Sequence, residues 1–237
     1  MTPRQIELRD NYLRTLEKIE SARERRGEGK PVTLHAAIKT VPVEDVRFLV
    51  ENFGLKVCGE NHAQEFNARY DDLSSVGARM DVIGHLQSNK VKYIAGRASL
   101  IHSLDSVKLA AEIDSRCKKL GTKQDVLIEV NIGEEESKTG VRPEDFERFT
   151  EEISVFDSLS IRGMMTMAPK CTEIDDFRKY FRESYRIFLD FFAKKSHNIG
   201  EAVLSMGMSD SFECAIEEGS DIVRVGSAIF GSRNYNK

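Results

Sequence analysis

The chain has 237 residues, of which 40% are hydrophobic and 31% are charged, as in an ordinary globular protein. Its formal net charge of -4 leaves no excess of basic residues that would attract nucleic acid or an anionic membrane surface. We therefore expect no nucleic-acid partner and no membrane partner.

The beginning of the chain and its cysteines indicate the cellular environment. The first residues, MTPRQIELRDNYL, are charged and contain no apolar core, and no window reaches the length of a membrane span. The sequence thus predicts a cytoplasmic protein. The four cysteines contain no C-x-x-C pair, which argues against a disulfide framework and a cysteine zinc site, so we predict no metal site.

The opening stretch, TPRQIELRDNYLRTLEKIESARERRG, predicts an N-terminal helix. Thr2 stands at the N-cap, Pro3 takes the first helical position, and Gln5 completes a capping box. Apolar side chains recur with helical spacing over the same stretch. These apolar residues are Ile6, Leu13, Leu16 and Ile19.

Eight short apolar runs follow this helix and alternate with helix-like stretches. The runs cover residues 32–38, 55–60, 79–84, 99–104, 125–132, 159–167, 202–207 and 221–226. Each run except the last is followed by a helix-like segment, most clearly at 43–54, 63–73, 106–121 and 173–196. Parallel strands need a crossover, usually a helix, so this alternation predicts a parallel sheet.

Eight such units match the size of a closed barrel. We predict an α/β fold in which residues 1–237 form a single-domain (β/α)8 TIM barrel with an extra N-terminal helix. An open doubly wound sheet is the alternative. That fold would normally have a glycine-rich turn after its first strand, and the turn IKTVPVE contains no glycine.

Two loops near the end of the chain suggest a phosphate site. TIM barrels carry their active sites at the carboxyl ends of the strands and often hold phosphate after strands seven and eight. After the seventh run, a helix beginning near Asp210 would direct backbone N–H groups at an anion. After the eighth, Gly226 permits close backbone approach and Ser227 offers a hydroxyl. Taken singly, each loop could equally be a glycine turn or a helix cap.

Strand alternation directs two basic residues toward the same place. If the apolar residues at 32–38 face the helices, Lys39 faces the barrel mouth. The same alternation turns Val223 and Val225 toward the helices and Arg224 inward, where its hydrogen bonds must be accepted. Because strand eight lies beside strand one in a closed barrel, Lys39, Arg224 and the phosphate site should share a pocket.

A lysine in such a pocket suits covalent chemistry better than a solvated strand end does. An amine attacks a carbonyl only in its neutral form, which partial desolvation and a neighbouring cation both favour. We therefore interpret Lys39 as a Schiff-base lysine. An aldolase that acts on a phosphosugar could use the same lysine and the same phosphate site.

Several runs resemble a known family. CGENHAQE, IGHLQSNKVKYI, VLIEVNIGEEESKTG, IRGMMTMAP and LSMGMSDSFECAIEEGSDIVRVGSAIFG look like the pyridoxal phosphate homeostasis proteins, relatives of the N-terminal barrel of alanine racemase. The resemblance spans nearly the whole chain. It implies that Lys39 binds pyridoxal 5′-phosphate (PLP) as an internal aldimine and that Arg224 faces the pyridine nitrogen. It further implies that Asn61, His85 and Met165 surround the ring and that Ser205, Met208, Ser209, Gly226 and Ser227 hold the phosphate.

The chain departs from the family pattern in two places. The family usually has serine where this chain has Ile38, and tryptophan and histidine where it has Met80 and Asp81. Neither departure removes a residue that the resemblance assigns to the cofactor. The second could alter the wall of the pocket.

The resemblance and the chemistry together predict a carrier or buffer of PLP rather than an enzyme. PLP withdraws electrons best when a carboxylate keeps its ring nitrogen protonated, and an arginine there prevents this. Related racemases add a second base on a further β domain, which we do not expect here because the sequence ends soon after the last predicted strand. The alternative is a PLP-dependent amino-acid racemase. We expect a monomer that serves PLP-dependent apoenzymes in PLP (vitamin B6) homeostasis.

Overall fold

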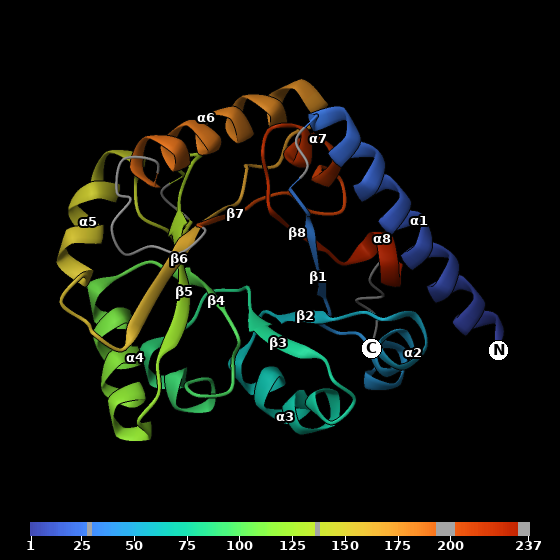
Figure 1. Ribbon diagram of the computed structural model, residues 1–237, viewed down its shortest axis with the longest axis horizontal. Coiled ribbons are helices and arrows are strands. Elements are labelled where there is room, and N and C mark those ends of the chain that lie inside the picture. Colours follow the sequence, from blue (N-terminus) through green and yellow to red (C-terminus); the bar gives the residue numbers. More distant parts are fainter. Residues whose placement is uncertain (28–29, 136–137, 193–201, 232–237) are drawn as a thin grey trace.

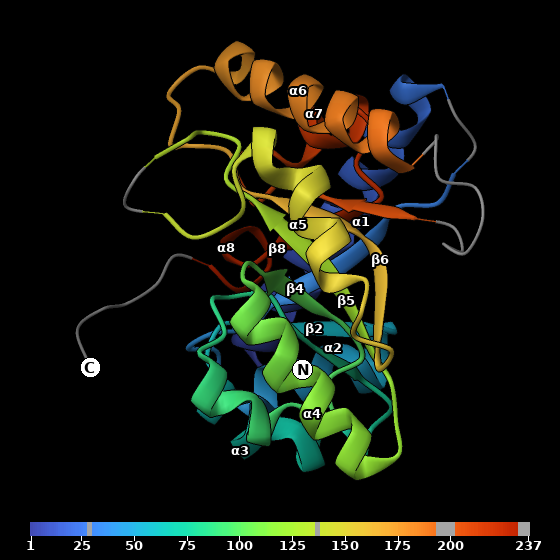
Figure 2. The same cartoon turned by 90° about the vertical axis from the view of Figure 1, so that its left-hand side faces the viewer.

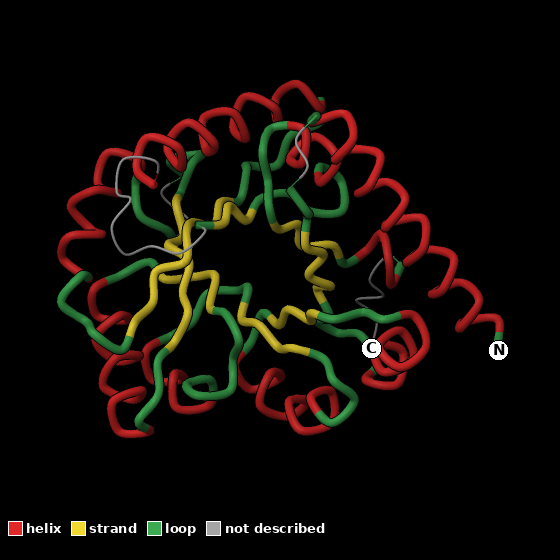
Figure 3. The backbone as a smooth tube through the Cα atoms, in the orientation of Figure 1, coloured by secondary structure: helices red, strands yellow, loops and turns green. Residues whose placement is uncertain are grey.

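The computed structural model describes residues 1–27, 30–135, 138–192 and 202–231. Within them, eight parallel strands close into a barrel in chain order, and β8 pairs with β1. Figure 3 shows this ring of strands inside a layer of helices. The closed ring confirms the predicted barrel and excludes the open doubly wound sheet.

The eight strands overlap the eight predicted runs, and all eight are shorter than predicted. They are β1 Thr33–Ala37, β2 Val57–Glu60, β3 Arg79–Val82, β4 Ile101–Leu104, β5 Gln124–Val130, β6 Leu159–Thr166, β7 Val203–Ser205 and β8 Ile222–Val225. The helices are α1 Pro3–Arg26, α2 Val43–Phe53, α3 Ala63–Ser74, α4 Val107–Leu120, α5 Phe146–Ile153, α6 Ile174–Phe192, α7 Phe212–Glu217 and α8 Ser227–Phe230. Two 3₁₀ helices, η1 Ser88–Tyr93 and η2 Pro143–Asp145, complete the described elements. Residues 193–196 of the helix predicted at 173–196 lie outside the described part of the chain.

Helix α1 begins as predicted but buries a different face. Thr2 caps it, the capping box with Gln5 is present, and Gly27 ends it in a left-handed conformation. Of the apolar residues that predicted the helix, only Ile19 is buried, whereas Ile6, Leu13 and Leu16 are exposed. The buried face repeats every three or four residues instead, through Leu8, Tyr12, Thr15, Ile19 and Ala22.

Helix α1 also explains how the barrel ends. We expected no helix after the last strand, but the short helix α8 follows β8. Side chains of α1 hold it by its carbonyls: Asn11 donates to the oxygen of Ile229 (3.2 Å) and Arg4 to that of Phe230 (2.9 Å). Figure 1 shows α1 running along α7 and α8, so α1 covers the side of the barrel where a long eighth helix would pack.

Two other predictions of helices need correction. The segment after β3 forms the 3₁₀ helix η1, a tighter turn that proteins use in short pieces. The helix after β7 begins at Phe212 with Ser211 at its N-cap, two residues later than the expected start near Asp210. The delay arises because Ser211 and Phe212 donate backbone hydrogen bonds to the carbonyl of Met208, which lengthens the loop.

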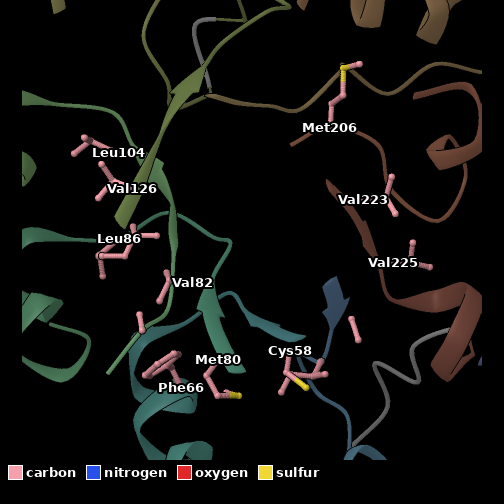
Figure 4. Packing of buried hydrophobic residues seen from close by; sticks show 14 of the residues in the cluster. Cys58, Phe66, Met80, Val82, Leu86, Leu104, Val126, Met206, Val223 and Val225 are labelled. Atoms are coloured by element: carbon pink, nitrogen blue, oxygen red, sulfur yellow. The ribbon is translucent and has the colours of Figure 1, made fainter. Parts of the chain in front are cut away.

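The strand side chains alternate between the helix layer and the barrel interior. Figure 4 shows Val223 and Val225 on the side of β8 that faces the helices, and Met80 pointing away from the interior near Phe66. Their neighbours Arg224 and Asp81 therefore point inward. The turned view in Figure 2 shows α6 and α7 packed over one side of the barrel and α3 and α4 over the other. No helix in the described ranges is long and apolar enough to cross a membrane.

Candidate functional site

Lys39 sits in a tight turn directly after β1. The amide of Ile38 donates to the carbonyl of Gly59 on β2 (3.0 Å), and the amide of Val41 closes the turn on the carbonyl of Ile38 (3.0 Å). Thr40 adopts a φ of +63°, an unusual conformation for a β-branched residue. Such strain is typical of functional sites, and here it fixes the direction in which the half-buried Lys39 leaves the strand.

A buried ion pair supports the backbone of this turn. Nη1 of Arg69 donates both to Oε1 of Glu60 (2.8 Å) and to the carbonyl of Ile38 (2.9 Å). Glu60, at the end of β2, is completely buried. Burial raises the pKa of its carboxyl to about 7, against the opposing attraction of Arg69. The backbone before Lys39 thus depends on a carboxyl that titrates near neutral pH.

We expect replacement of Glu60 by glutamine to change how stability depends on pH. A folded-state pKa near 7, above the unfolded value of 4.5, means that the folded chain holds a proton that the unfolded chain has released. The wild type should therefore lose about 2 to 3 kcal/mol relative to Glu60→Gln between pH 5 and pH 8. Urea unfolding at each pH measures this. A difference between Glu60→Gln and the wild type that stays flat over this pH range would contradict the prediction.

Arg224 lies inside the barrel on β8, beside β1. It is 5% exposed and pairs in register with His35, four residues before Lys39. Nη1 donates to Oγ of Ser205 (2.7 Å) and Nη2 to the carbonyl of Thr166 (2.9 Å). Burial lowers the pKa of the guanidinium to about 10, so Arg224 remains a cation near neutral pH. The predicted inward arginine is present, with acceptors for its hydrogen bonds.

The loops after β7 and β8 meet through one hydroxyl. Oγ of Ser209 accepts hydrogen bonds from the amides of Gly226 (3.2 Å) and Ala228 (3.3 Å). A Cβ on Gly226 would lie 3.1 Å from the carbonyl of Ala37, so this turn packs against the end of β1, two residues before Lys39. We call Ser209, Gly226, Ser227 and Ala228 the Ser209 cup. It supplies hydroxyl and amide donors of the kind that bind phosphate.

Three further predicted residues lie near Arg224 and the cup. Ser205 is buried, and its hydroxyl contacts Arg224 rather than the Ser209 cup. Met165 is buried on β6, in register with Ser205. Met208 is 40% exposed and lines a cavity of about 300 Å³ together with Asn131. Met165 and Ser205 thus belong to the barrel interior and Met208 to its rim.

Asn61 and His85 occupy the rim after β2 and β3. The backbone of Asn61 packs against Gly84, where an added Cβ would lie 2.6 Å from the carbonyl of Asn61. His85 is about half exposed, and its Nδ1 lies 3.1 Å from Oδ2 of Asp105. The close approach at Gly84 therefore brings the two predicted residues side by side at the same part of the rim.

The structure adds buried polar residues that the sequence did not single out as site residues. Glu129, on β5, is 5% exposed; Oε1 accepts from the hydroxyl of Thr139 (3.0 Å), and burial raises the pKa of its carboxyl. Asp81 and His102 meet across the interior, with Oδ2 of Asp81 3.4 Å from Nε2 of His102. The sequence signal was present in each case, as a polar residue at an inward position of a predicted strand.

Comparisons with known proteins match most of the chain. The profile of the alanine racemase N-terminal domain matches residues 30–234. The chain is 45% identical over 223 residues to the pyridoxal phosphate homeostasis protein of Aquifex aeolicus (strain VF5), covering 94% of this chain and 96% of the relative.

Two solved structures share the fold over most of their length. One is a protein of unknown function from Bifidobacterium adolescentis, with a TM-score of 0.88 and 32% identity, covering 97% of both chains. The other is PipY of Synechococcus elongatus PCC7942 with PLP bound, with a TM-score of 0.76 and 27% identity, covering 89% of this chain and all of PipY.

Proposed function

Because the chain belongs to the alanine racemase N-terminal domain family and, within it, to the pyridoxal phosphate homeostasis proteins, we propose that it binds PLP reversibly and carries or buffers it. The observation that carries this proposal is the convergence of Lys39, Arg224 and the Ser209 cup on the ends of β8 and β1. Lys39 offers an amine, Arg224 offers a fixed cation, and the Ser209 cup offers hydrogen-bond donors for an anion. PLP has an aldehyde, a pyridine nitrogen and a phosphate that match them.

The residues of this chain fit the cofactor in the following roles. Lys39 would bind the aldehyde covalently through its amine. The hydroxyls of Ser209 and Ser227 would bind the phosphate, and the amides of Gly226 and Ala228 would hold the Ser209 hydroxyl in place for it. Arg224, held by Ser205 and Thr166, would face the ring nitrogen. Met165 and Asn61 would line the ring.

Arg224 also supports a role without catalysis. When bound, PLP supplies an electron sink whose strength depends on protonation of its ring nitrogen. Arg224 is a buried cation that donates hydrogen bonds, so it would hold the ring nitrogen in the unprotonated state. A guanidinium in this position therefore favours binding of the cofactor over its use.

The same proposal implies a recipient for the cofactor and a location for the protein. A reversible carrier would deliver PLP to apoenzymes that depend on it, and we place it in the cytoplasm as a monomer. Transfer can be measured by adding the PLP-loaded chain to an apoenzyme and recording the regain of activity. Regain no faster than with an equal concentration of free PLP would support buffering alone and would contradict delivery.

An absorbance titration tests the binding itself. Addition of PLP to the purified chain should produce the near-visible absorption of lysine-bound PLP, and this should saturate at one PLP per chain. Absorption that rises without saturation, as for scattered surface lysines, would contradict the proposed site. An aldolase that acts on a phosphosugar would need no such chromophore, so the titration separates that alternative as well.

The racemase alternative needs a separate measurement. We expect the loaded chain to convert D and L amino acids no faster than free PLP at the same concentration, because Arg224 weakens the electron sink. A panel of amino acids followed by chiral chromatography measures this. Turnover far above the free-PLP rate for any member would establish a racemase and contradict the carrier proposal.

A further inference from the structure

Three ligand-type side chains meet inside the barrel, apart from the Ser209 cup. His35 comes from β1, Asp81 from β3 and His102 from β4, and none is more than 4% exposed. Oδ2 of Asp81 lies 2.8 Å from Nδ1 of His35 and 3.4 Å from Nε2 of His102. One donor atom from each of the three residues lies within 4.8 Å of the other two.

His35 carries an unexplained polar atom. Its Nδ1 is buried and has no hydrogen-bond partner among the residues that the structure describes, although Asp81 is close. The nitrogen therefore does not point along the line to the carboxylate oxygen. A buried ring nitrogen needs a polar partner, and an ion bound to both His35 and the nearby Asp81 carboxylate would supply one.

His102 is held in a suitable orientation. Its Nδ1 lies 3.2 Å from Oγ of Ser205, which already accepts a hydrogen bond from Arg224. The Ser205 oxygen has a second lone pair, so His102 can donate its Nδ1 proton to it. The lone pair of Nε2 then faces the Asp81 carboxylate, an arrangement that a cation between them would stabilise. Metal-binding histidines are commonly oriented through their second nitrogen in this way.

We propose that His35, Asp81 and His102 bind a divalent first-row transition-metal ion, such as zinc, inside the barrel. Two imidazoles and one carboxylate form a donor set that zinc and iron sites use, with a further position open. An ion about 2.0 to 2.2 Å from each ligand places neighbouring donor atoms roughly 3 to 3.5 Å apart. The separations of 2.8 and 3.4 Å from Asp81 lie close to that range.

This inference does not depend on the proposed function, because none of the three ligands is assigned to PLP. The site is nevertheless linked to the cofactor pocket through one hydroxyl, since Ser205 contacts both His102 and Arg224. No spacing motif marks this site in the sequence, because the ligands come from three different strands and only barrel closure brings them together.

Cobalt and zinc titrations without added PLP test the site. Protein purified without an affinity tag and dialysed against a chelator should bind one Co²⁺, with visible d–d bands and no thiolate charge-transfer band, and one Zn²⁺ should displace it. Absence of cobalt bands in the folded wild type would overturn the proposal and leave a metal-free hydrogen-bond network. A thiolate band would also overturn it, because cysteines would then be the ligands.

Matched variants locate the ion. Asp81→Asn and His102→Gln should each lower zinc affinity by at least about 100-fold, above the usual loss for an outer-shell partner. His62→Gln, the same histidine substitution at an exposed position, should bind as the wild type does. Circular dichroism confirms that each variant folds, and if Asp81→Asn does not, His35→Asn replaces it. A folded ligand variant with unchanged affinity would overturn the assignment.

Discussion

Lys39→Ala is expected to lose the near-visible absorption of bound PLP completely and to bind PLP at least about 100-fold more weakly, a loss of about 2.7 kcal/mol. The reason is that Lys39 alone supplies the proposed covalent bond, whereas the Ser209 cup and Arg224 supply only ionic and hydrogen-bonding contacts. Some affinity should remain, because these contacts do not involve the lysine side chain. Absorbance titration and equilibrium dialysis measure the two effects separately.

The matched control is Lys56→Ala, the same substitution at an exposed lysine just before β2. It should keep both the absorption and the affinity of the wild type. If Lys39→Ala retains the absorption, another lysine holds the aldehyde and the assignment fails. Equal loss in both variants would likewise show that the effect is not specific to Lys39.

Gly163→Ala is expected to have the largest effect on stability. Gly163 lies in β6 with a φ of +138°, and an added Cβ would lie 1.9 Å from the carbonyl oxygen of Val203 in β7. The backbone can accommodate a methyl group at that distance only if β6 and β7 separate. We expect a loss of at least about 4 kcal/mol from strain and broken strand pairing, measured by urea unfolding. PLP binding should fall with it, because this pairing sets Ser205 beside Met165.

Gly121→Ala separates the two causes of that loss. Gly121 also has a positive φ, of +65°, but nothing lies within 4 Å of the added Cβ. It should therefore cost only about 1 kcal/mol, the conformational part. If Gly163→Ala costs no more than Gly121→Ala, the close approach of β6 and β7 is not essential for closing the barrel.

The order of the strands could be predicted from the sequence because each buried run is short, apolar and followed by a turn. Strand alternation then correctly turned Arg224 inward and Val223 and Val225 outward, since the side-chain period of a strand is fixed at two. Together with ring closure, this was enough to place Arg224 beside the strand that leads to Lys39.

Helix faces and helix ends were harder to predict. In α1 the apolar residues Ile6, Leu13 and Leu16 are exposed, because the helix packs on α7 and α8 through a face whose polar Thr15 is buried. Which stripe of a helix is buried depends on its neighbours, and a sequence with apolar residues on two faces does not reveal it. The short helix α8 depends in the same way on the side chains of α1 that bond to its carbonyls.

The buried polar contacts could not be predicted from the sequence, for a different reason. Arg69 joins Glu60 to the carbonyl before Lys39, and His35, Asp81 and His102 meet from three strands. Each such contact requires the curvature of the closed barrel and the rotamers of long side chains. Position in a strand predicts that a residue points inward, but not which inward residue it contacts.

The central claim is that Lys39 is the residue that holds PLP, and chemical reduction followed by mass spectrometry tests it most directly. Borohydride treatment of the PLP-loaded chain makes the bond to the lysine permanent, and peptide mapping then locates the added mass. We predict one added phosphopyridoxyl group per chain, on the peptide that contains Lys39. An added mass on another lysine, or a chain that remains unlabelled at saturating PLP, would contradict the claim.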